Sequence, residues 1–265
     1  MYWDRYIHRN NPRRIEPLDK PLDMYVMLDT ETTGLHPEEG ATLIEIGAFL
    51  VQPGNENSRP KFEQLIDPRQ PLSEFITGLT GITDQMLQGM PTAGAAMLRF
   101  HQWLDQVWPT GEPLTIIAHN AEFDVSFLDA AERVYDPTAS GFDCRWLCTK
   151  EMSWELNPQK RHHRVTDLIA DYHIGDTEEH RALADAIQEQ MIYRALCHEA
   201  TMRGKWIGQL ASCWTRRRHT RTAATMTAAR LSKEPAPSAT RSTKPTAPDA
   251  KRHPLTPKSR RPQSI

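Results

Sequence analysis

Three candidate β-strands in close succession are the feature that most limits what this chain can fold into. Runs rich in β-branched, aromatic and other apolar residues occupy 24–32, 42–51 and 61–67, and segments rich in turn-forming residues separate them. Connections this short join antiparallel neighbours, because a parallel crossover needs a dozen or more residues. The sequence therefore predicts a sheet that begins with three antiparallel strands.

The segments that follow alternate between helix and strand. Apolar periodicity predicts a helix over 93–108, and the apolar run 114–119 is typical of a buried strand. A second helix is expected after Asn120, which we place at its N-cap, followed by a strand near 142–148 and a last helix over 180–198. Alternating elements after an antiparallel start predict an α/β fold, a mixed sheet with helices packed on it.

The two ends of the chain differ from this central region. Residues 215–265 hold 13 of the chain's 32 Lys and Arg but two of its 34 Asp and Glu, a net charge of +11, which leaves −13 for the rest. Because this basic, Pro/Ala/Thr-rich tail has few large apolar residues, we expect it to be disordered. We expect an irregular arm over 1–22, with 23–214 as the folded domain.

Composition argues against several classes of protein. Mean hydropathy is −0.61, and no run of about 18 apolar residues occurs, so we expect no transmembrane helix and no membrane partner. The basic residues near the N-terminus have no apolar stretch behind them, and we expect no secretory signal. The cysteines are irregularly spaced and lack histidines at zinc-finger distances: Cys144, Cys148, Cys197 and Cys213. Reduced thiols and a cytoplasmic location are expected.

Acidic residues occur where a folded chain usually avoids them. Asp29 and Glu31 lie two apart on the first strand, so their side chains share one face. Asp124 falls in the first turn of a helix, where the dipole favours a carboxylate, and Asp185 lies in an otherwise apolar helical stretch. Like charges this close are tolerated when a cation lies between them. Since Mg²⁺ prefers oxygen ligands, the four acids predict a two-metal site.

These acids fall in three motifs that are ordered along the chain. The stretches LDTETTGL (28–35), AHNAEFD (118–124) and HRALADA (180–186) resemble the three exonuclease motifs of the DEDDh (DnaQ-like) family. That family includes the proofreading epsilon subunit of bacterial DNA polymerase III, ribonuclease T and oligoribonuclease. The resemblance covers roughly residues 24–195, and it implies an RNase H-like sheet of five strands, the first three antiparallel.

The resemblance also implies a role for each motif residue. Asp29 would bridge two Mg²⁺ or Mn²⁺ ions, with Glu31 and Asp185 supporting one of them. Asp124 would lie near the other ion, and His180 would be the general base that takes a proton from the attacking water. His180 and Asp185 are five residues apart, about 140° around a helix. We therefore expect His180 on a loop or in the first helical turn.

Substrate contacts are expected beside the first motif. In the family, residues just after the first acids hold and wedge the 3'-terminal nucleotide; here these are Thr32, Thr33, Gly34 and Leu35. Thr80, in the separate stretch 79–83, and His180 are the other expected substrate-binding residues. Thr80 stands where the epsilon subunit carries a histidine, which is a departure from the pattern. The basic stretch 160–164, with His162 and His163, could contact a nucleic-acid backbone or form a solvated loop.

The function implied is metal-dependent 3'-5' exonucleolytic hydrolysis of single-stranded DNA with release of nucleoside 5'-monophosphates, in proofreading or repair. No residue separates sugar preference, so an exoribonuclease of the ribonuclease T or oligoribonuclease type is the alternative. A non-catalytic nucleic-acid-binding or replisome adaptor is a third interpretation, which would not require all five motif residues. A DNA polymerase or sliding clamp is a weaker partner hypothesis, because Gly208–Trp214 matches a clamp-binding peptide poorly and favours a frayed helix end. The basic tail is either an electrostatic arm for nucleic acid or a passive extension.

Overall fold

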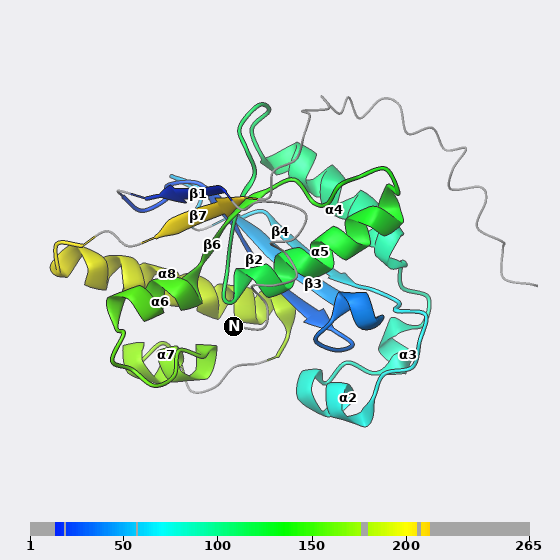
Figure 1. Cartoon of the computed structure of the whole chain (residues 1–265). Helices are drawn as coiled ribbons and strands as arrows, with labels where there is room; N and C mark the ends of the chain where they lie inside the picture. Colours follow the sequence, from blue (N-terminus) through cyan, green and yellow to red (C-terminus); the bar gives the residue numbers. More distant parts are fainter. Residues whose placement is uncertain (1–13, 19, 57, 176–179, 206–207, 213–265) are drawn as a thin grey trace, which may run out of the picture. The chain divides into compact units, whose positions relative to one another are not determined.

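A mixed sheet of seven strands forms the centre of the fold (Figure 1). The computed structural model describes residues 14–18, 20–56, 58–175, 180–205 and 208–212. The strand order is β1-β7-β6-β5-β2-β3-β4. The strands are β1 (Arg14–Pro17), β2 (Tyr25–Thr32), β3 (Leu43–Val51), β4 (Lys61–Leu65), β5 (Thr115–Ala118), β6 (Arg145–Cys148) and β7 (Gln209–Ser212).

The strand directions match the prediction from sequence. Strands β2, β3 and β4 are antiparallel neighbours, and β5 and β6 run parallel to β2. The carboxyl ends of β2, β5 and β6 therefore meet at one edge of the sheet. The five strands that the family resemblance implied are β4-β3-β2-β5-β6, and two short strands extend this set.

Those two short strands correct two expectations. The arm expected to be irregular contains β1, and Gln209–Ser212, expected to be a helix end, forms β7. Strand β7 pairs antiparallel with both β1 and β6. Four residues are too few for a period-two pattern, so pairing to the existing sheet edge, and not local propensity, produces these strands.

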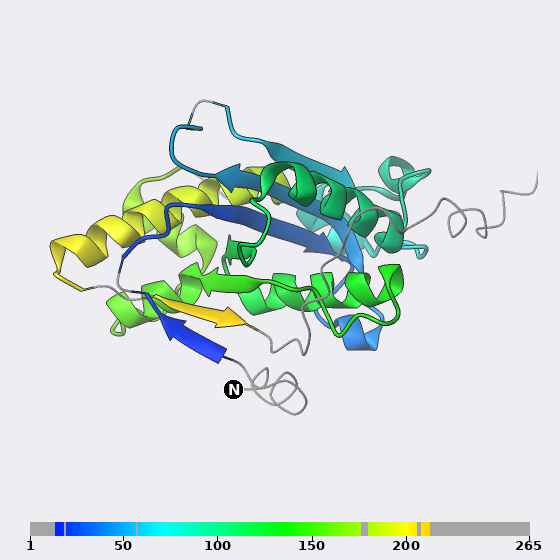
Figure 2. The same ribbon diagram turned by 90° about the horizontal axis from the view of Figure 1, so that it is seen from above.

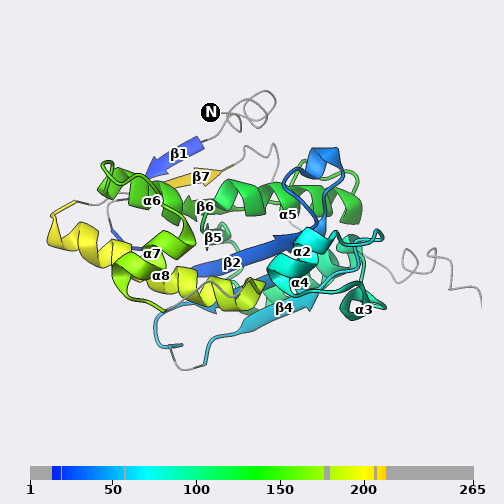
Figure 3. The same ribbon diagram turned by 90° about the horizontal axis from the view of Figure 1, so that it is seen from below.

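Helices cover both faces of the sheet. They are α2 (Glu74–Thr80), α3 (Asp84–Leu87), α4 (Ala93–Val107), α5 (Ala121–Tyr135), α6 (Thr149–Leu156), α7 (Val165–Tyr172) and α8 (Ala182–Met202), with a short 3-10 helix η1 (Pro37–Glu39). Helices α4 and α5 lie over one face (Figure 2), where they pack with even-numbered β2 residues such as Val26 and Leu28. Helices α6, α7 and α8 lie on the other face (Figure 3), on the side of odd-numbered residues such as Tyr25 and Met27.

Helix α8 lies directly on the sheet and is covered in turn by α6 and α7. A Cβ added to Gly47 of β3 would lie 2.1 Å from the Leu183 backbone nitrogen, so only glycine allows this approach. Because α8 is enclosed on several sides, it buries polar residues as well as apolar ones. This contact brings the first turn of α8 against β2 and β3.

The remaining expectations about the chain have mixed outcomes. Asn120 occupies the N-cap of α5 as expected, but it has φ of 67° and its side chain makes no capping hydrogen bond. None of the helices within the described stretches combines the length and apolar character needed to cross a membrane. Cys144, Cys148 and Cys197 are free thiols. The tail 215–265 lies outside the described residues.

Candidate active site

The pairing of β2 with β3 fixes the direction of the first two acids. Asp29 lies opposite Gly47, and Glu31 lies opposite Glu45. Directly opposed residues of an antiparallel pair share a face. Since α8 packs over Gly47, Asp29 and Glu31 both point toward the first turn of α8.

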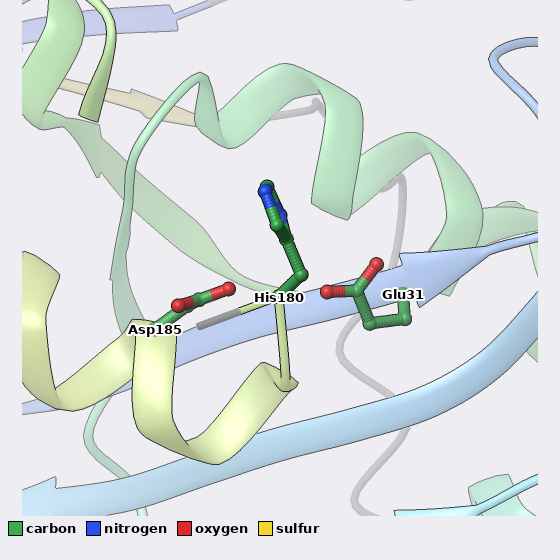
Figure 4. Close-up of side chains that lie close together, drawn as sticks. All are labelled: Glu31, His180 and Asp185. Carbon is green, nitrogen blue, oxygen red and sulfur yellow. The ribbon is translucent and has the colours of Figure 1, made fainter. Parts of the chain in front are cut away.

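Helix α8 completes a compact cluster with these acids. Potential ligand atoms of Glu31, His180 and Asp185 all lie within 4.8 Å of one another, and Figure 4 shows the three side chains converging. Asp185 is buried in the first turn of α8, whereas His180 precedes that helix and has φ of 53°. The histidine is therefore presented from the loop, as the angular spacing requires.

Asp124 approaches from the helix on the other side of the sheet. Its Oδ1 accepts a hydrogen bond of 2.8 Å from the Thr30 hydroxyl, which belongs to the opposite face of β2. Burial raises the pKa of Asp124 to about 7, although the bond from Thr30 opposes the rise. The charge of Asp124 acts on Asp29 across the strand, whereas the group of ligand atoms within 4.8 Å consists of Glu31, His180 and Asp185.

The carboxyl group of Asp29 is influenced by the other acidic side chains around it. Burial, followed by the negative charges of neighbouring carboxylates, raises the pKa of Asp29 well above its ordinary value; these neighbours are Glu189, Asp124, Glu31 and Asp185. Asp29 as a whole is partly exposed to solvent. Its carboxyl group is surrounded by protein atoms, so burial is the largest cause of the raised pKa. Carboxylates gathered this closely are costly to ionise unless a cation compensates them. Their oxygens are the donors that Mg²⁺ and Mn²⁺ bind, so the residues fit such ions.

Comparison with known proteins agrees with this geometry. Residues 26–192 match the family model described as Exonuclease, RNase_T. This chain belongs to that exonuclease family. Within the family, the five motif residues place it in the DnaQ-like DEDDh group.

The relatives of this exonuclease are much longer proteins. DNA polymerase III PolC-type of Bacillus subtilis (strain 168) is 32% identical over 189 residues, covering 69% of this chain and 12% of that protein. The PolC-type polymerase of Listeria welshimeri is 36% identical over 163 residues, covering 61% and 10%. The chain thus spans about a tenth of the length of these curated relatives.

Solved structures share the fold of the exonuclease. The nuclease domain of 3'hExo, described as a DEDDh family member bound to rAMP, has a TM-score of 0.57 at 19% identity, covering 76% of this chain and all of that one. Cell-death related nuclease 4 (CRN-4) has a TM-score of 0.56 at 16% identity, covering 69% and 65%. The RNase H-like fold expected from the motifs is confirmed.

One buried acid near the motif residues, Glu189, was not predicted from the sequence. Glu189 is 2% exposed and lies one helical turn beyond Asp185. Its Oε2 accepts a 3.0 Å hydrogen bond from the backbone N–H of His119, which ties α8 to the end of β5. Two acids four residues apart on a helix, such as Asp185 and Glu189, usually indicate a solvated face. The spacing therefore did not predict that Glu189 is buried.

The side chain of His119, in the second motif, contacts two further segments. Its Nε2 lies 2.9 Å from the His163 carbonyl oxygen and its Nδ1 lies 2.9 Å from the Thr149 hydroxyl. Burial lowers the pKa of His119 to about 4, so its ring is neutral at pH 7 and its Nε2–H donates to the carbonyl. This bond holds the loop before α7 against the carboxyl edge of the sheet.

The predicted substrate residues fall into two groups. Leu35 is 65% exposed, and a Cβ added to the preceding Gly34 would lie 3.4 Å from the Ala41 Cβ, an ordinary contact. The Thr32 hydroxyl donates to the Gly34 carbonyl oxygen, and the Thr33 hydroxyl accepts from the Thr42 amide, so both shape this loop. These four residues directly follow the acids of β2.

Thr80 belongs to α2 and not to the loop after β2. It is 4% exposed; its hydroxyl donates to the Ile76 carbonyl oxygen and accepts from the Ile82 amide. Both bonds shape the end of α2, and a substrate contact of Thr80 stays a prediction.

The basic stretch 160–164 is only partly available to a nucleic acid. His163 is buried with its Nδ1 2.8 Å from the Ser153 hydroxyl. Lys160 pairs with Asp171, and Arg164 pairs with Asp167. Arg161, His162 and Arg164 are exposed, and of these Arg164 is engaged by Asp167. A phosphate backbone could therefore reach Arg161 and His162 without displacing that ion pair.

Proposed function

We propose that this chain is a divalent-metal-dependent 3'-5' exonuclease that releases nucleoside 5'-monophosphates from single-stranded DNA. The observation that carries the proposal is the convergence of Glu31, His180 and Asp185 within 4.8 Å, beside Asp29 and Asp124. Three distant segments supply these side chains. A fold alone does not require four carboxylates and a histidine to meet at one strand end.

The donor set suits two divalent cations. Asp29, Glu31, Asp124 and Asp185 would hold them, with Asp29 as the shared ligand. Such cations lower the pKa of a bound water and neutralise charge on the phosphate and on the leaving 3'-oxygen. Mg²⁺ and Mn²⁺ are the expected ions, since both accept carboxylate ligands.

The chain's own residues would orient the substrate and move the proton. His180 would accept a proton from the attacking water through a ring nitrogen, which requires it to lie at hydrogen-bond reach of that water. Leu35, exposed beside the acids, would pack against the 3'-terminal base. Thr32, Thr33 and Gly34 would hold the loop that carries it.

RNA is the second candidate substrate. The structure of the 3'hExo nuclease domain is described as bound to rAMP, and no residue around the cluster separates the two sugars. The PolC-type relatives favour DNA and a role in replication or repair, with a DNA polymerase or clamp as a partner. We also expect the protein in the cytoplasm, since its described cysteines are free thiols.

Degradation of 3'-labelled single-stranded DNA and RNA would test the proposal. We expect mononucleotide release that needs a free 3'-hydroxyl, stops with chelator and resumes with added Mg²⁺ or Mn²⁺. Asp29→Asn should lower the rate by at least about 10³-fold, since the shared ligand is lost. Asp105→Asn, an exposed acid on α4, serves as the matched control. Activity of D29N near that of the wild type would refute the assigned site.

A further inference from the structure

A sixth acid lies beside the cluster without belonging to it. Glu45 on β3 is fully buried, at 0% exposure, and lies directly opposite Glu31. A buried carboxylate is strongly destabilising unless charge and hydrogen bonds compensate it. Its partners should therefore explain why β3 carries an acid here.

Within the described part of the chain, Glu45 bonds to the residues that begin α8. Arg181 donates from Nη2 to Oε1 at 2.7 Å and from Nε to Oε2 at 3.1 Å. The backbone N–H of Ala182 donates to the same Oε2 at 3.0 Å. A two-point guanidinium bond together with a helix N-terminal amide fixes orientation as well as position.

Arg181 also reaches the next strand. Its Nη2 lies 3.6 Å from a carboxylate oxygen of Glu63 on β4, whose side chain is 49% exposed. The contact to Glu45 is shorter and fully buried on the acid's side, so it is the stronger constraint. Residue 181 is thus attached to β3, the strand paired with the one that carries Asp29 and Glu31.

His180 immediately precedes this attachment. Its φ of 53° lies in the left-handed region, which a non-glycine residue adopts only when its surroundings hold it there. Two kinds of polar contact hold the backbone next to His180. The Arg181 carbonyl oxygen accepts a 2.9 Å hydrogen bond from the Asp185 N–H within α8, and the Glu45 bonds attach the same residues to β3. Movement of Arg181 would change the direction of the His180 side chain relative to Glu31 and Asp185.

We propose that Glu45, through Arg181 and the Ala182 amide, is the positioning residue that sets the His180 imidazole against the acidic cluster. The inference rests on the proposed function, in which His180 is the general base. Glu45 contacts neither substrate nor water in this role, and its effect on the reaction passes through His180. The alternative is that Glu45 merely attaches α8 to the sheet, in which case its loss disturbs all the α8 residues.

A double-mutant cycle separates these roles. Glu45→Gln keeps the shape but removes the charge and leaves an amide facing the guanidinium donors. We expect E45Q to lower kcat on single-stranded DNA about 10- to 100-fold, with KM changed less than about threefold. In a His180→Ala background, E45Q should cost less than about twofold more, because the group it positions is gone.

Hydrogen–deuterium exchange supplies a readout that does not depend on activity. Amides over 180–185 should exchange at least about 10-fold faster in E45Q, while amides of α4 and α5 keep the wild-type rate. Glu63→Gln, which removes only the outer ion pair, is the matched control and should leave kcat and exchange near wild type. If E45Q does not fold, Arg181→Lys, which keeps the charge and loses the two-point bond, replaces it in both measurements.

Three results would overturn the proposal. These are an unchanged kcat in E45Q, an equal loss of kcat in the wild-type and H180A backgrounds, or unchanged exchange over 180–185. Failure of the proposed function would look different, because wild-type protein would then release no mononucleotide, or H180A would keep full activity. In those cases the exchange rates still decide whether Glu45 holds the His180 segment.

Discussion

At the residue scale, the site combines groups whose ionisation opposes folding. Burial raises the pKa of Asp124 to about 7 and lowers that of His119 to about 4. An acid with a raised folded pKa binds more protons when folded, so its contribution to the free energy of unfolding falls as pH rises from about 4 to 7. A histidine with a lowered pKa has the opposite effect between about 4 and 6.5.

The two effects can be separated by removing Asp124's charge. In chelator, Asp124→Asn should be more stable than the wild type at pH 8 by about 1 kcal/mol or more, about 2–4 °C in Tm, and this gain should shrink toward pH 4. Both proteins share His119, so its effect cancels in the comparison. Thermal unfolding followed by circular dichroism between pH 4 and 8 measures the difference. If the stability gained by Asp124→Asn did not change with pH, ionisation of Asp124 would not be what destabilises the folded protein.

The sequence predicted candidate site residues only where they belong to one of the three motifs. Asp29, Glu31, Asp124, His180 and Asp185 were proposed from order and spacing. Glu31, His180 and Asp185 lie within 4.8 Å of one another, and the charges of Glu31, Asp124 and Asp185 act on Asp29. Glu45 and Glu189 were not, because an acid in a strand or on a helix normally indicates a solvated face. Their burial follows from α8 packing on β2 and β3, which is a long-range contact that no local pattern encodes.

At the element scale, the site depends on how closely α8 approaches β3. A Cβ on Gly47 would meet the Leu183 nitrogen at 2.1 Å and the Ala182 carbonyl carbon at 2.3 Å, and both are backbone atoms. Gly47→Ala should therefore displace the start of α8 and lower the free energy of unfolding by about 3 kcal/mol or more. Nuclease activity should fall with it, since His180 and Asp185 move with the helix.

A second glycine provides the control for this prediction. Gly78 lies in α2 with nothing within 4 Å of an added Cβ. Gly78→Ala should stabilise the protein by up to about 1 kcal/mol through helix propensity and leave activity unchanged. Urea unfolding of both variants tests the pair. Equal stability of G47A and the wild type would show that α8 is less closely packed than described.

Elements with strong periodicity were predicted well, and short ones were not. Strands β2, β3 and β5 and helices α4, α5 and α8 match their expected ranges to within a few residues. Helices α2, α3, α6 and α7, of four to eight residues each, were missed, as were β1 and β7. Helix α6 begins directly at the end of β6 without a side-chain cap, and β7 exists because β6 offers an unpaired edge. Tertiary contacts decide such short segments.

At the scale of the whole molecule, the proposed cations connect β2, α5 and α8. Ions that bind only the folded state stabilise it by RT ln(1 + [L]/Kd), about 1.4 kcal/mol when the ion is at ten times its Kd. Adding 10 mM Mg²⁺ or Mn²⁺ to chelated protein should raise Tm by a few degrees at pH 8. Asp29→Asn should lose most of this shift, whereas D105N keeps it. An equal shift in D29N would place the bound ion elsewhere.

Charge is divided unevenly along the whole chain, and this bears on how an acidic enzyme could hold a polyanion. Residues 1–214 carry a net charge of −13, whereas 215–265 carry +11. Each Lys or Arg that contacts a phosphate of a single strand contributes about −0.7 to the slope of log affinity against log salt. Deleting 215–265 should therefore weaken binding of single-stranded DNA at 50 mM salt and flatten the slope by about 2 or more, if at least three of its 13 cations act.

Two comparisons make the deletion decisive. The rate on a saturating short oligonucleotide should be unchanged, because the motif residues all lie before residue 215. A full-length variant with the tail's Lys and Arg replaced by Gln keeps the length and should behave like the deletion if charge is what matters. Fluorescence anisotropy over a salt series gives the slopes. If the deletion leaves the slope as steep as in the intact chain, the phosphate contacts come from the folded part, where exposed Arg161 and His162 become the first residues to test.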